Sequence, residues 1–283
     1  MLKDLPILIY KMRIASKNML QLLPIKTRRF DSPFDIFDVL ESYLKDVLMS
    51  GDVIVLSSKF VSLSEGSFLD LSRVRPSPES KELSKKFNLD REFAEVIQRE
   101  SDDIISGVSG FLLCVKSNML CPNAGVDKSN IQKGRVVIYP RDPGEAALLI
   151  RDEMKFRLGV DVGVVLSDSR LMPMRKGTIG VALASAGLEG LVDMRGRKDL
   201  FGKVLRVTVQ SLADDLCSAA QPLMGESNEA VPIVLVRGLN KSFLSHSLYN
   251  MEDFGISRNQ CVYMRSFFGV FLREQKKGDW HDV

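Results

Sequence analysis

Histidine is scarce in this sequence, and its scarcity excludes two kinds of site. The 283 residues include only two histidines, His246 between two serines and His281 near the C-terminus, and we expect both to be exposed to solvent. A histidine-based catalytic triad and a histidine-rich zinc site are therefore not expected. Any chemistry must rely on carboxylates, cations and a bound metal ion.

Paired cysteines are also lacking. The four cysteines, Cys114, Cys121, Cys217 and Cys261, show no C-x-x-C spacing, and the chain is not a small cysteine-rich one. Disulfide frameworks and cysteine metal sites usually show closer or repeated spacings. We therefore expect four reduced thiols in a cytoplasmic protein.

Long hydrophobic runs, a strong net charge and nucleotide fingerprints are absent as well. The apolar run 5–10 is too short for a signal peptide, and no run approaches the ~18 residues of a membrane span. The 39 basic and 36 acidic residues are interspersed, so no nucleic-acid surface is expected and anionic partners need a local site. Neither a G-x-x-x-x-G-K-[ST] loop nor a G-x-G-x-x-G turn occurs.

The pattern that remains is that of an ordinary globular protein, with 45% hydrophobic residues. Apolar alternation and β-branched runs predict strands, and i, i+3, i+4 spacing predicts helices. The predicted strands are 22–26, 53–57, 111–115, 135–138, 160–166, 204–210 and 232–237, and the predicted helices are 34–49, 79–87, 90–100, 143–158 and 211–221, the last ended by Pro222. Because these elements follow no strict βαβ rhythm, the expected class is α+β, or mixed α/β. We expect an N-terminal extension at 1–20, a main domain at 21–238 and a C-terminal extension at 239–283.

Two polar segments follow predicted strands and carry aspartates. Asp127 lies in the glycine-containing loop 121–130, where it could hold a hard cation or belong to an ordinary turn. Asp168 ends an apolar strand in Ser167-Asp-Ser169, which is where open sheets bind ligands, although it could be a plain strand-end turn. Arg175 and Lys176 follow closely and could neutralise a phosphate or a carboxylate. We take these two as candidate catalytic residues.

Two further segments combine hydroxyls, backbone amides and charge. Ser58 and Lys59 follow a predicted strand and suit a phosphate, unless they form an exposed strand end. The segment 224–232 carries Glu226 and Glu229 after a glycine that frees the chain to reverse, but it could also be a plain connecting loop.

Several of these segments resemble, in order, the coenzyme F-420-0:L-glutamate ligases. Asn123-Ala-Gly-Val-Asp-Lys-Ser-Asn130 is similar to the family's N-A-G-[VI]-D-x-S-N motif, and Ser167-Asp-Ser169 to its S-D-[ST] segment. The remaining matching segments are Gly51-Asp-Val-Ile-Val-Leu-Ser-Ser-Lys59, Ser64-Glu-Gly66, Gly180-Val-Ala, Arg195-Gly-Arg-Lys-Asp-Leu-Phe-Gly202, Ala213-Asp-Asp-Leu and Met224-Gly-Glu226. The likeness covers about Leu22 to Gly238.

The resemblance implies a role for each matching position. It implies that Asp127 and Asp168 hold a metal ion together, with Ser169 and Glu226 as ligands of a second ion. It implies nucleotide contacts from one cleft, listed as Ser58, Lys59, Asn130, Met224, Gly225, Glu226, Ser227, Asn228, Glu229, Ala230 and Val231.

The resemblance also implies an activity and an assembly. The family joins L-glutamate to a deazaflavin coenzyme precursor by way of an acyl phosphate, using GTP and Mg²⁺ or Mn²⁺, with K⁺ as a further candidate ion. Its fold is a two-lobed one with mixed and antiparallel sheets, and it forms an interlocked homodimer.

Three departures from the family pattern keep other functions open. The Gly-Arg pair that follows S-D-[ST] is missing, and Arg170 stands directly after Ser169. Leu63 occupies the position of a usual lysine, and the early G-L-P is replaced near Thr27-Arg28-Arg29. A ligase for another acid, or a non-catalytic protein that binds nucleotide and metal, are the alternatives. We expect Arg170 to reshape the acid-substrate pocket, unless it points to solvent.

Overall fold

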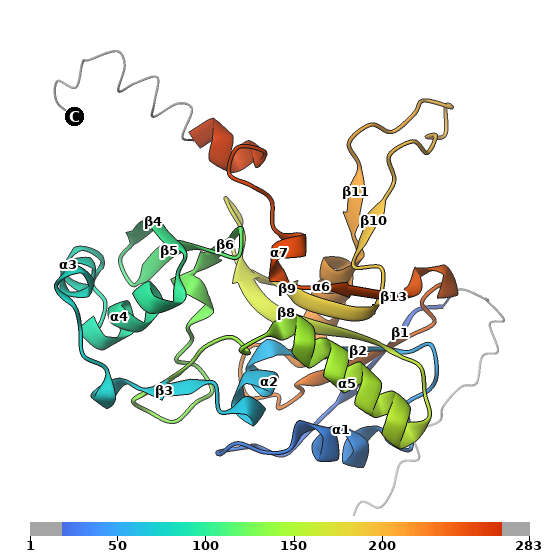
Figure 1. The fold of residues 1–283 in the computed structure, drawn as a ribbon, viewed down its shortest axis with the longest axis horizontal. Helices are drawn as coiled ribbons and strands as arrows, with labels where there is room; N and C mark the ends of the chain where they lie inside the picture. The colour runs from blue at the N-terminus through green and yellow to red at the C-terminus, as the bar shows by residue number, and fades with distance from the viewer. Residues whose placement is uncertain (1–18, 268–283) are drawn as a thin grey trace, which may run out of the picture.

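A six-stranded mixed sheet forms the centre of the molecule (Figure 1). The structure is a computed structural model that describes residues 19–267, so His281 and most of the expected N-terminal extension lie outside it. The strand order is β1-β12-β2-β8-β9-β13, with bounds Gln21–Ile25 for β1, Ile233–Arg237 for β12, Val53–Ser57 for β2, Gly163–Leu171 for β8, Thr178–Leu188 for β9 and Leu244–Tyr249 for β13. β2 and β8 run parallel, and the other neighbours in this sheet are antiparallel.

Both faces of the sheet are covered, which explains why its middle strands are continuous apolar runs. Side chains alternate between faces, so Ile54 and Leu56 of β2 pack under the helices of one face while Val53 and Val55 pack on the other. The first face carries α1 (Ile36–Leu44), α2 (Ser58–Glu65) and α5 (Pro143–Leu158), and the second carries α6 (Leu212–Met224).

Residues 68–137 build a second group of elements with a core of its own, drawn in cyan and green in Figure 1. It contains β3 (Phe68–Asp70), the 3-10 turn Leu71–Arg73, α3 (Pro78–Phe87), α4 (Arg91–Glu100), β4 (Asp103–Val108), β5 (Phe111–Lys116), β6 (Met119–Pro122), the 3-10 turn Asn123–Gly125 and β7 (Arg135–Val137). β4, β5 and β6 form an antiparallel sheet, and β3 pairs with β7. The mixed α/β class predicted from the sequence is confirmed.

Most of the predicted elements are present, and their boundaries follow local chemistry. α5 spans the predicted residues, with Pro143 in its first turn and Gly159 closing it at φ 69°. The first helix is shorter than the predicted 34–49 at both ends: it stops at Leu44, and it starts at Ile36 because the Asp35 carboxylate accepts the backbone N–H groups of Phe37 and Asp38. The prediction that Pro222 ends α6 is wrong: the helix runs to Met224, since a proline this close to the end disturbs only the last turn.

The predicted strand 204–210 is wrong over most of its length. Only β11 (Val209–Ser211) is a strand, and it pairs with β10 (Leu191–Asp193) at the base of an arm formed by residues 191–211. The arm projects away from the central sheet (Figure 1). Leu200 and Phe201 at its tip are almost completely exposed, as is Val207. Residues 204–208 make only scattered backbone hydrogen bonds to the other side of the arm, such as Gly196 N–H to the Leu205 carbonyl, and these do not build a continuous strand ladder.

The segment that we expected to be a C-terminal extension contributes to the central sheet. After the 3-10 turn Lys241–Phe243, β13 pairs with β9, and the short helix α7 (Met251–Phe254) follows. Asn250 caps α7 and also accepts the backbone N–H of Gly144 on α5. Among residues 19–267, no helix has the length and apolar character needed to cross a bilayer.

Candidate functional site

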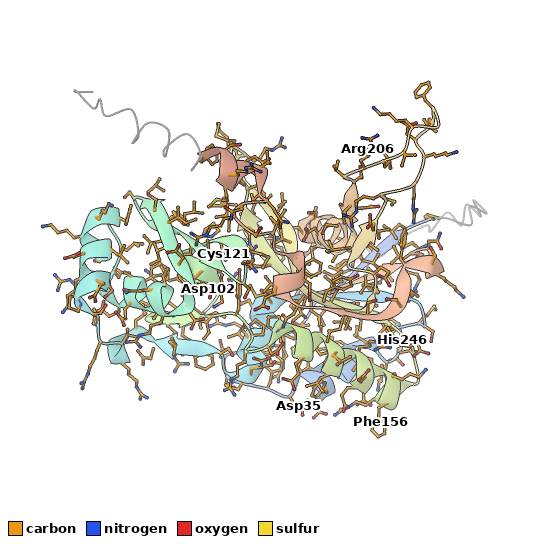
Figure 2. The ribbon with its side chains drawn as sticks, turned by 45° about the horizontal axis from the view of Figure 1, so that its top comes forward. Asp35, Asp102, Cys121, Phe156, Arg206 and His246 are labelled. Carbon is orange, nitrogen blue, oxygen red and sulfur yellow. The ribbon has the colours of Figure 1, made fainter. Side chains whose placement is uncertain are left out.

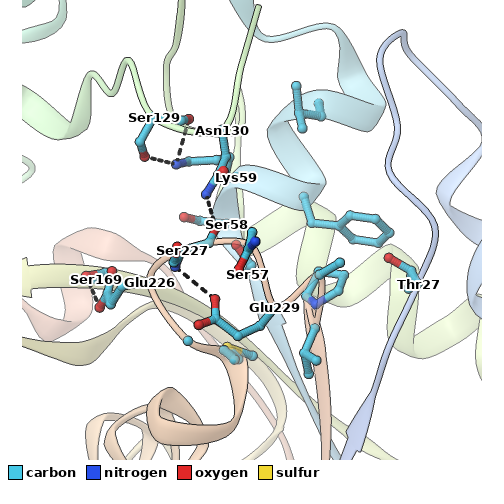
Figure 3. A pocket seen from close by; sticks show the side chains of 18 of the residues that line it. Thr27, Ser57, Ser58, Lys59, Ser129, Asn130, Ser169, Glu226, Ser227 and Glu229 are labelled. Atoms are coloured by element: carbon cyan, nitrogen blue, oxygen red, sulfur yellow. Dashed lines mark hydrogen bonds between the residues drawn. The ribbon is translucent and has the colours of Figure 1, made fainter.

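A cavity of about 710 Å³ opens at the carboxyl ends of the parallel strands β2 and β8 (Figure 3). Ser57 and Ser167 are the last register partners of this pair: after Ser57 the chain leaves the sheet into α2, whereas β8 continues to Leu171 paired with β9 alone. Ligands of open sheets bind at this kind of edge. The lining comes from five segments: 27–30; 57–60 with 63; 127 with 129–131; 167–169; and 221 with 224–232.

Lys59 and Asp127 form the ion pair on one side of the cavity. The Lys59 ammonium donates to Asp127 Oδ2 at 2.5 Å and to Ser129 Oγ at 2.8 Å, and Asp127 Oδ1 accepts the backbone N–H of Ser129 at 2.7 Å. Burial disfavours the charged form of Asp127, but Lys59 and the Ser129 hydrogen bonds outweigh it and lower the pKa of this carboxyl. Asp127 is therefore an ionised group that already has a cationic partner.

Asp168 is a second carboxylate of the cavity, near enough to Lys59 and Asp127 for their charges to act on it, and its hydrogen-bond partners differ. Its Oδ2 accepts the Tyr139 hydroxyl at 2.5 Å and lies 3.6 Å from the Arg170 guanidinium. Burial raises the pKa of Asp168, although Arg170 and the hydrogen bond from Tyr139 act in the other direction. Both aspartates line the cavity, as the sequence predicted.

The loop after α6 supplies two further carboxylates, Glu226 and Glu229. Glu226 Oε1 accepts the Ser169 hydroxyl at 2.8 Å, the Thr178 hydroxyl at 2.7 Å and the Gln221 amide at 2.5 Å. Glu229 Oε2 accepts the backbone N–H of Ser227 at 2.8 Å. Asn130 donates to the backbone carbonyl of Ser227 at 2.8 Å, and this bond joins the loop to the Asp127 segment across the cavity.

The cavity gathers most of the residues predicted for the site. Every predicted nucleotide contact lines the cavity: Ser58, Lys59, Asn130 and the whole loop 224–231. The predicted metal ligands Asp127, Asp168 and Ser169 line it as well. Arg175 and Lys176 do not line it. They are exposed in the turn between β8 and β9, because β8 continues to Leu171 and carries this turn away from the aspartate.

Arg170 is buried close to Asp168. It is 7% exposed and donates to the Tyr139 hydroxyl at 3.1 Å, so it neither points to solvent nor lines the cavity. The alternative that it points to solvent is wrong, while the expectation that it alters the acid-substrate pocket stays a prediction, since Arg170 lies on the same face of β8 as Asp168 without lining this cavity. The sequence reasoning also did not assign a role to Tyr139, and it treated Arg28, which lines the cavity, only as part of a departure from the family pattern.

The donor chemistry of the cavity fits a hard divalent cation, which prefers carboxylate and hydroxyl oxygens. Within residues 19–267, no three His, Cys, Asp or Glu side chains are grouped closely enough to hold one ion by themselves. One or two carboxylates that share an ion with substrate phosphates are the usual arrangement for Mg²⁺. Asp127 and Asp168 are the residues that would hold such an ion.

The cavity brings together four carboxylates, a lysine, two arginines and a polar loop beside a parallel strand pair, and this set of charged and polar groups has the character of a site for small anionic molecules. Comparison with known proteins narrows this class of site, because the family model F-420-0:Gamma-glutamyl ligase matches residues 24–238. The chain belongs to this family, as the motifs predicted.

Three curated relatives give the degree of similarity. The coenzyme F-420:L-glutamate ligase of Methanopyrus kandleri is 37% identical over 222 residues, covering 78% of this chain and 87% of the relative. The protein of that name from Methanocaldococcus jannaschii is 41% identical over 194 residues, covering 68% and 78%. The one from Methanothermobacter thermautotrophicus is 36% identical over 192 residues, covering 68% and 76%.

Gly125, in the loop that leads to Asp127, offers a test of how this site is packed. Its φ is +76°, and an added Cβ would lie 2.1 Å from Cζ of the buried Tyr139 ring. Gly125→Ala should lower the free energy of unfolding by about 2–5 kcal/mol, from overpacking and left-handed strain together.

Gly134→Ala is the matched control for Gly125→Ala. Gly134 has a similar φ of +86° with nothing within 4 Å of an added Cβ, so it should cost only the backbone strain of about 1–2 kcal/mol. Urea unfolding of both variants measures the difference. Equal losses of unfolding free energy in the two variants would show that the Tyr139 ring does not require a glycine at position 125.

Proposed function

We propose that this protein joins L-glutamate to a carboxylate of coenzyme F-420-0 in a reaction that consumes GTP and requires Mg²⁺ or Mn²⁺. Membership of the ligase family supports the reaction. The observation that carries the proposal is the single cavity in which Lys59, Asp127, Asp168 and the loop 224–231 meet. The two groups of elements that line it, the central sheet and residues 68–137, would be the two lobes of the ligase.

The reaction needs activation because an amine does not displace an oxide from a carboxylate. Transfer of the γ-phosphoryl group of GTP to a carboxylate oxygen of the acid substrate gives an acyl phosphate and GDP. The amine of glutamate then attacks the carbonyl carbon, the amide forms, and inorganic phosphate leaves with the former carboxylate oxygen. A divalent cation, when bound, offsets the charge of the triphosphate and of the acids.

The protein's own groups would orient these anions. Lys59 is bonded to Asp127 and reaches the cavity, so it can exchange that partner for a phosphate oxygen while the carboxylate turns to the cation. Exposed backbone amides of the loop 224–231 can donate to phosphate oxygens. The Asn130–Ser227 hydrogen bond would hold the loop against the Asp127 segment during the reaction.

One observation favours a related ligase with another acid substrate as the second candidate. The cavity is lined by Leu63 on one side and by Arg28 and Arg29 on the strand-to-helix loop after β1. Positive charge is therefore supplied from the β1 side of the cavity, where the resemblance did not predict it. A cavity charged in this way could favour an acid of different shape.

The decisive experiment is incubation of the purified protein with GTP, Mn²⁺, L-glutamate and F-420-0, followed by mass spectrometry. We expect a product heavier than F-420-0 by one glutamyl residue, together with GDP and phosphate in equal amounts. Omission of GTP or addition of a chelator should abolish the product. GDP formation only with another acid would support the second candidate, and no turnover with any acid would leave a non-catalytic binding protein.

Lys59→Ala tests the nucleotide contact separately from catalysis. Loss of a charge-assisted contact to a phosphate costs about 1.5–3 kcal/mol, so GTP affinity should fall roughly ten- to a hundred-fold in calorimetry. Lys128→Ala is the control, because Lys128 lies in the same segment but pairs with Asp90 and does not line the cavity. Unchanged affinity in Lys59→Ala would exclude Lys59 as a phosphate contact.

We also propose that the arm formed by residues 191–211 makes the protein a homodimer. Figure 2 shows the side chains of the arm, including Arg206, standing away from the rest of the molecule. Leu200 and Phe201 at the tip and Val204 and Val207 beside them are exposed apolar residues. Monomeric proteins rarely expose such a cluster, and a projecting arm can reach the body of a second copy.

Replacing both tip residues, Leu200→Ser and Phe201→Ser, tests this assembly. If these two side chains are buried in the dimer interface, the Kd of the dimer should rise by at least roughly 30-fold, which corresponds to about 2 kcal/mol. Light scattering after size-exclusion chromatography measures this shift. Phe156→Ser on α5, which removes a phenylalanine that is 86% exposed, should leave the assembly unchanged. A wild-type protein that is monomeric would refute the proposal.

A further inference from the structure

We propose that Tyr139 and Arg170 are positioning residues that fix one oxygen of Asp168 and leave its other oxygen facing the cavity as a cation ligand. The inference rests on the proposed function, because it concerns the carboxylate that would hold the cation. Neither residue is among the family motifs described above, and neither lines the cavity.

The direction of each hydrogen bond in this group follows from its chemistry. An arginine can only donate, and an ionised carboxylate can only accept. The Tyr139 hydroxyl must therefore give its single proton to Asp168 Oδ2, at 2.5 Å, and accept from Arg170 at 3.1 Å. The Cys121 thiol lies 3.2 Å from the same hydroxyl and can donate to its remaining lone pair. The Tyr139 hydroxyl thus has a single possible hydrogen-bond arrangement, in which it donates to Asp168.

The two oxygens of Asp168 are therefore not equivalent. Oδ2 is engaged by the Tyr139 hydroxyl and lies 3.6 Å from Arg170. Within residues 19–267, no side chain or backbone group forms a hydrogen bond with Oδ1. Because Asp168 lines the cavity, Oδ1 is the oxygen left to contact a ligand there. A carboxylate fixed in this way would hold a cation through one oxygen, in one orientation.

The cost of burying Arg170 supports a role in the site rather than in packing alone. Its Nε is buried without a partner in the described structure, and its Nη1 donates only to the Met119 sulfur at 3.6 Å. A guanidinium that is 7% exposed and incompletely bonded costs stability, and an apolar side chain of similar size would often be neutral or better here. The interactions that offset this cost are those with Tyr139 and Asp168.

The Tyr139 ring is itself held firmly. Its Cζ would lie 2.1 Å from any Cβ at position 125, so the loop before Asp127 packs directly against the ring. The Lys116 ammonium lies 5.7 Å from the ring centre on another side. Since the ring is 6% exposed, its hydroxyl can act only on groups already placed beside it. The phenol that orients Asp168 is thus packed against the segment that carries the other aspartate.

Tyr139→Phe tests the proposal, because it removes only the hydroxyl and keeps the ring. Loss of a group that orients a metal ligand typically weakens metal binding or activity about 10–100-fold. We expect Mn²⁺ affinity to fall by that factor, in electron paramagnetic resonance titrations with Mn²⁺ alone and with Mn²⁺ plus GTP. The Mn²⁺ concentration needed for half-maximal ligation should rise in parallel, while KM for glutamate stays close to the wild-type value.

Tyr249→Phe is the matched control. Its hydroxyl also donates to a carboxylate, Glu189 Oε2 at 3.0 Å, but it lies on β13 and does not line the cavity. Mn²⁺ affinity should be unchanged in this variant. Arg170→Met should reproduce the loss seen in Tyr139→Phe, and Arg170→Lys, which keeps a donor and the charge, should restore part of it.

The outcomes separate this inference from the proposed function. A wild-type protein that ligates glutamate with Mn²⁺, combined with Tyr139→Phe binding Mn²⁺ as tightly as the wild type, would overturn only the positioning role. A wild-type protein that binds no Mn²⁺ with or without GTP would overturn both. Equal losses in Tyr139→Phe and Tyr249→Phe would show a general effect of removing a phenol hydroxyl, and would also overturn the positioning role.

Discussion

The site depends on the parallel pairing of β2 with β8. Among the strands of the described central sheet this is the one parallel pair, and its register sets Ser57 level with Ser167. Both strands are buried on both faces, so neither can slip without moving a whole apolar surface. Lys59 follows β2 in the first turn of α2, Asp168 follows Ser167 within β8, and the segments that carry Asp127 and Glu226 complete the lining of the cavity. The rigidity of the site is therefore that of the core.

Each carboxylate of the cavity already has a partner from the protein. Lys59 neutralises Asp127, the phenol of Tyr139 and the guanidinium of Arg170 serve Asp168, and neutral hydroxyl and amide groups serve Glu226. Glu229 accepts a backbone N–H, so four acids face one cavity, each with a hydrogen-bond partner from the protein. The partners differ in how freely they can leave: Lys59 sits on a flexible side chain, whereas the buried Tyr139 and Arg170 cannot move away. The two aspartates therefore differ in how tightly their partners are held in place.

The sequence was informative where local chemistry and periodicity decide structure. The β-branched run of β2, the proline and glycine at the ends of α5, and the polar segments around Asp127 and Asp168 were all predictable in this way. The arm and the role of Arg170 were not. Alternation in 204–208 has the period of a strand, but a strand also needs a regular ladder, and here only scattered hydrogen bonds to the other side of the arm form. The contact of Arg170 with Tyr139 spans 31 positions, and no local pattern announces it.

The match to the family ends at residue 238, but the central sheet does not. β13 lies beyond the matched region and pairs with β9 through Leu244, Leu248 and Tyr249. Without it, the backbone of β9 along 185–188 would present unpaired hydrogen-bonding groups on an edge rich in alanine and leucine, which invites pairing with other chains. The unit in which the edge of β9 is paired is therefore longer than the unit that sequence similarity outlines, and expression boundaries for this protein belong after β13 and α7.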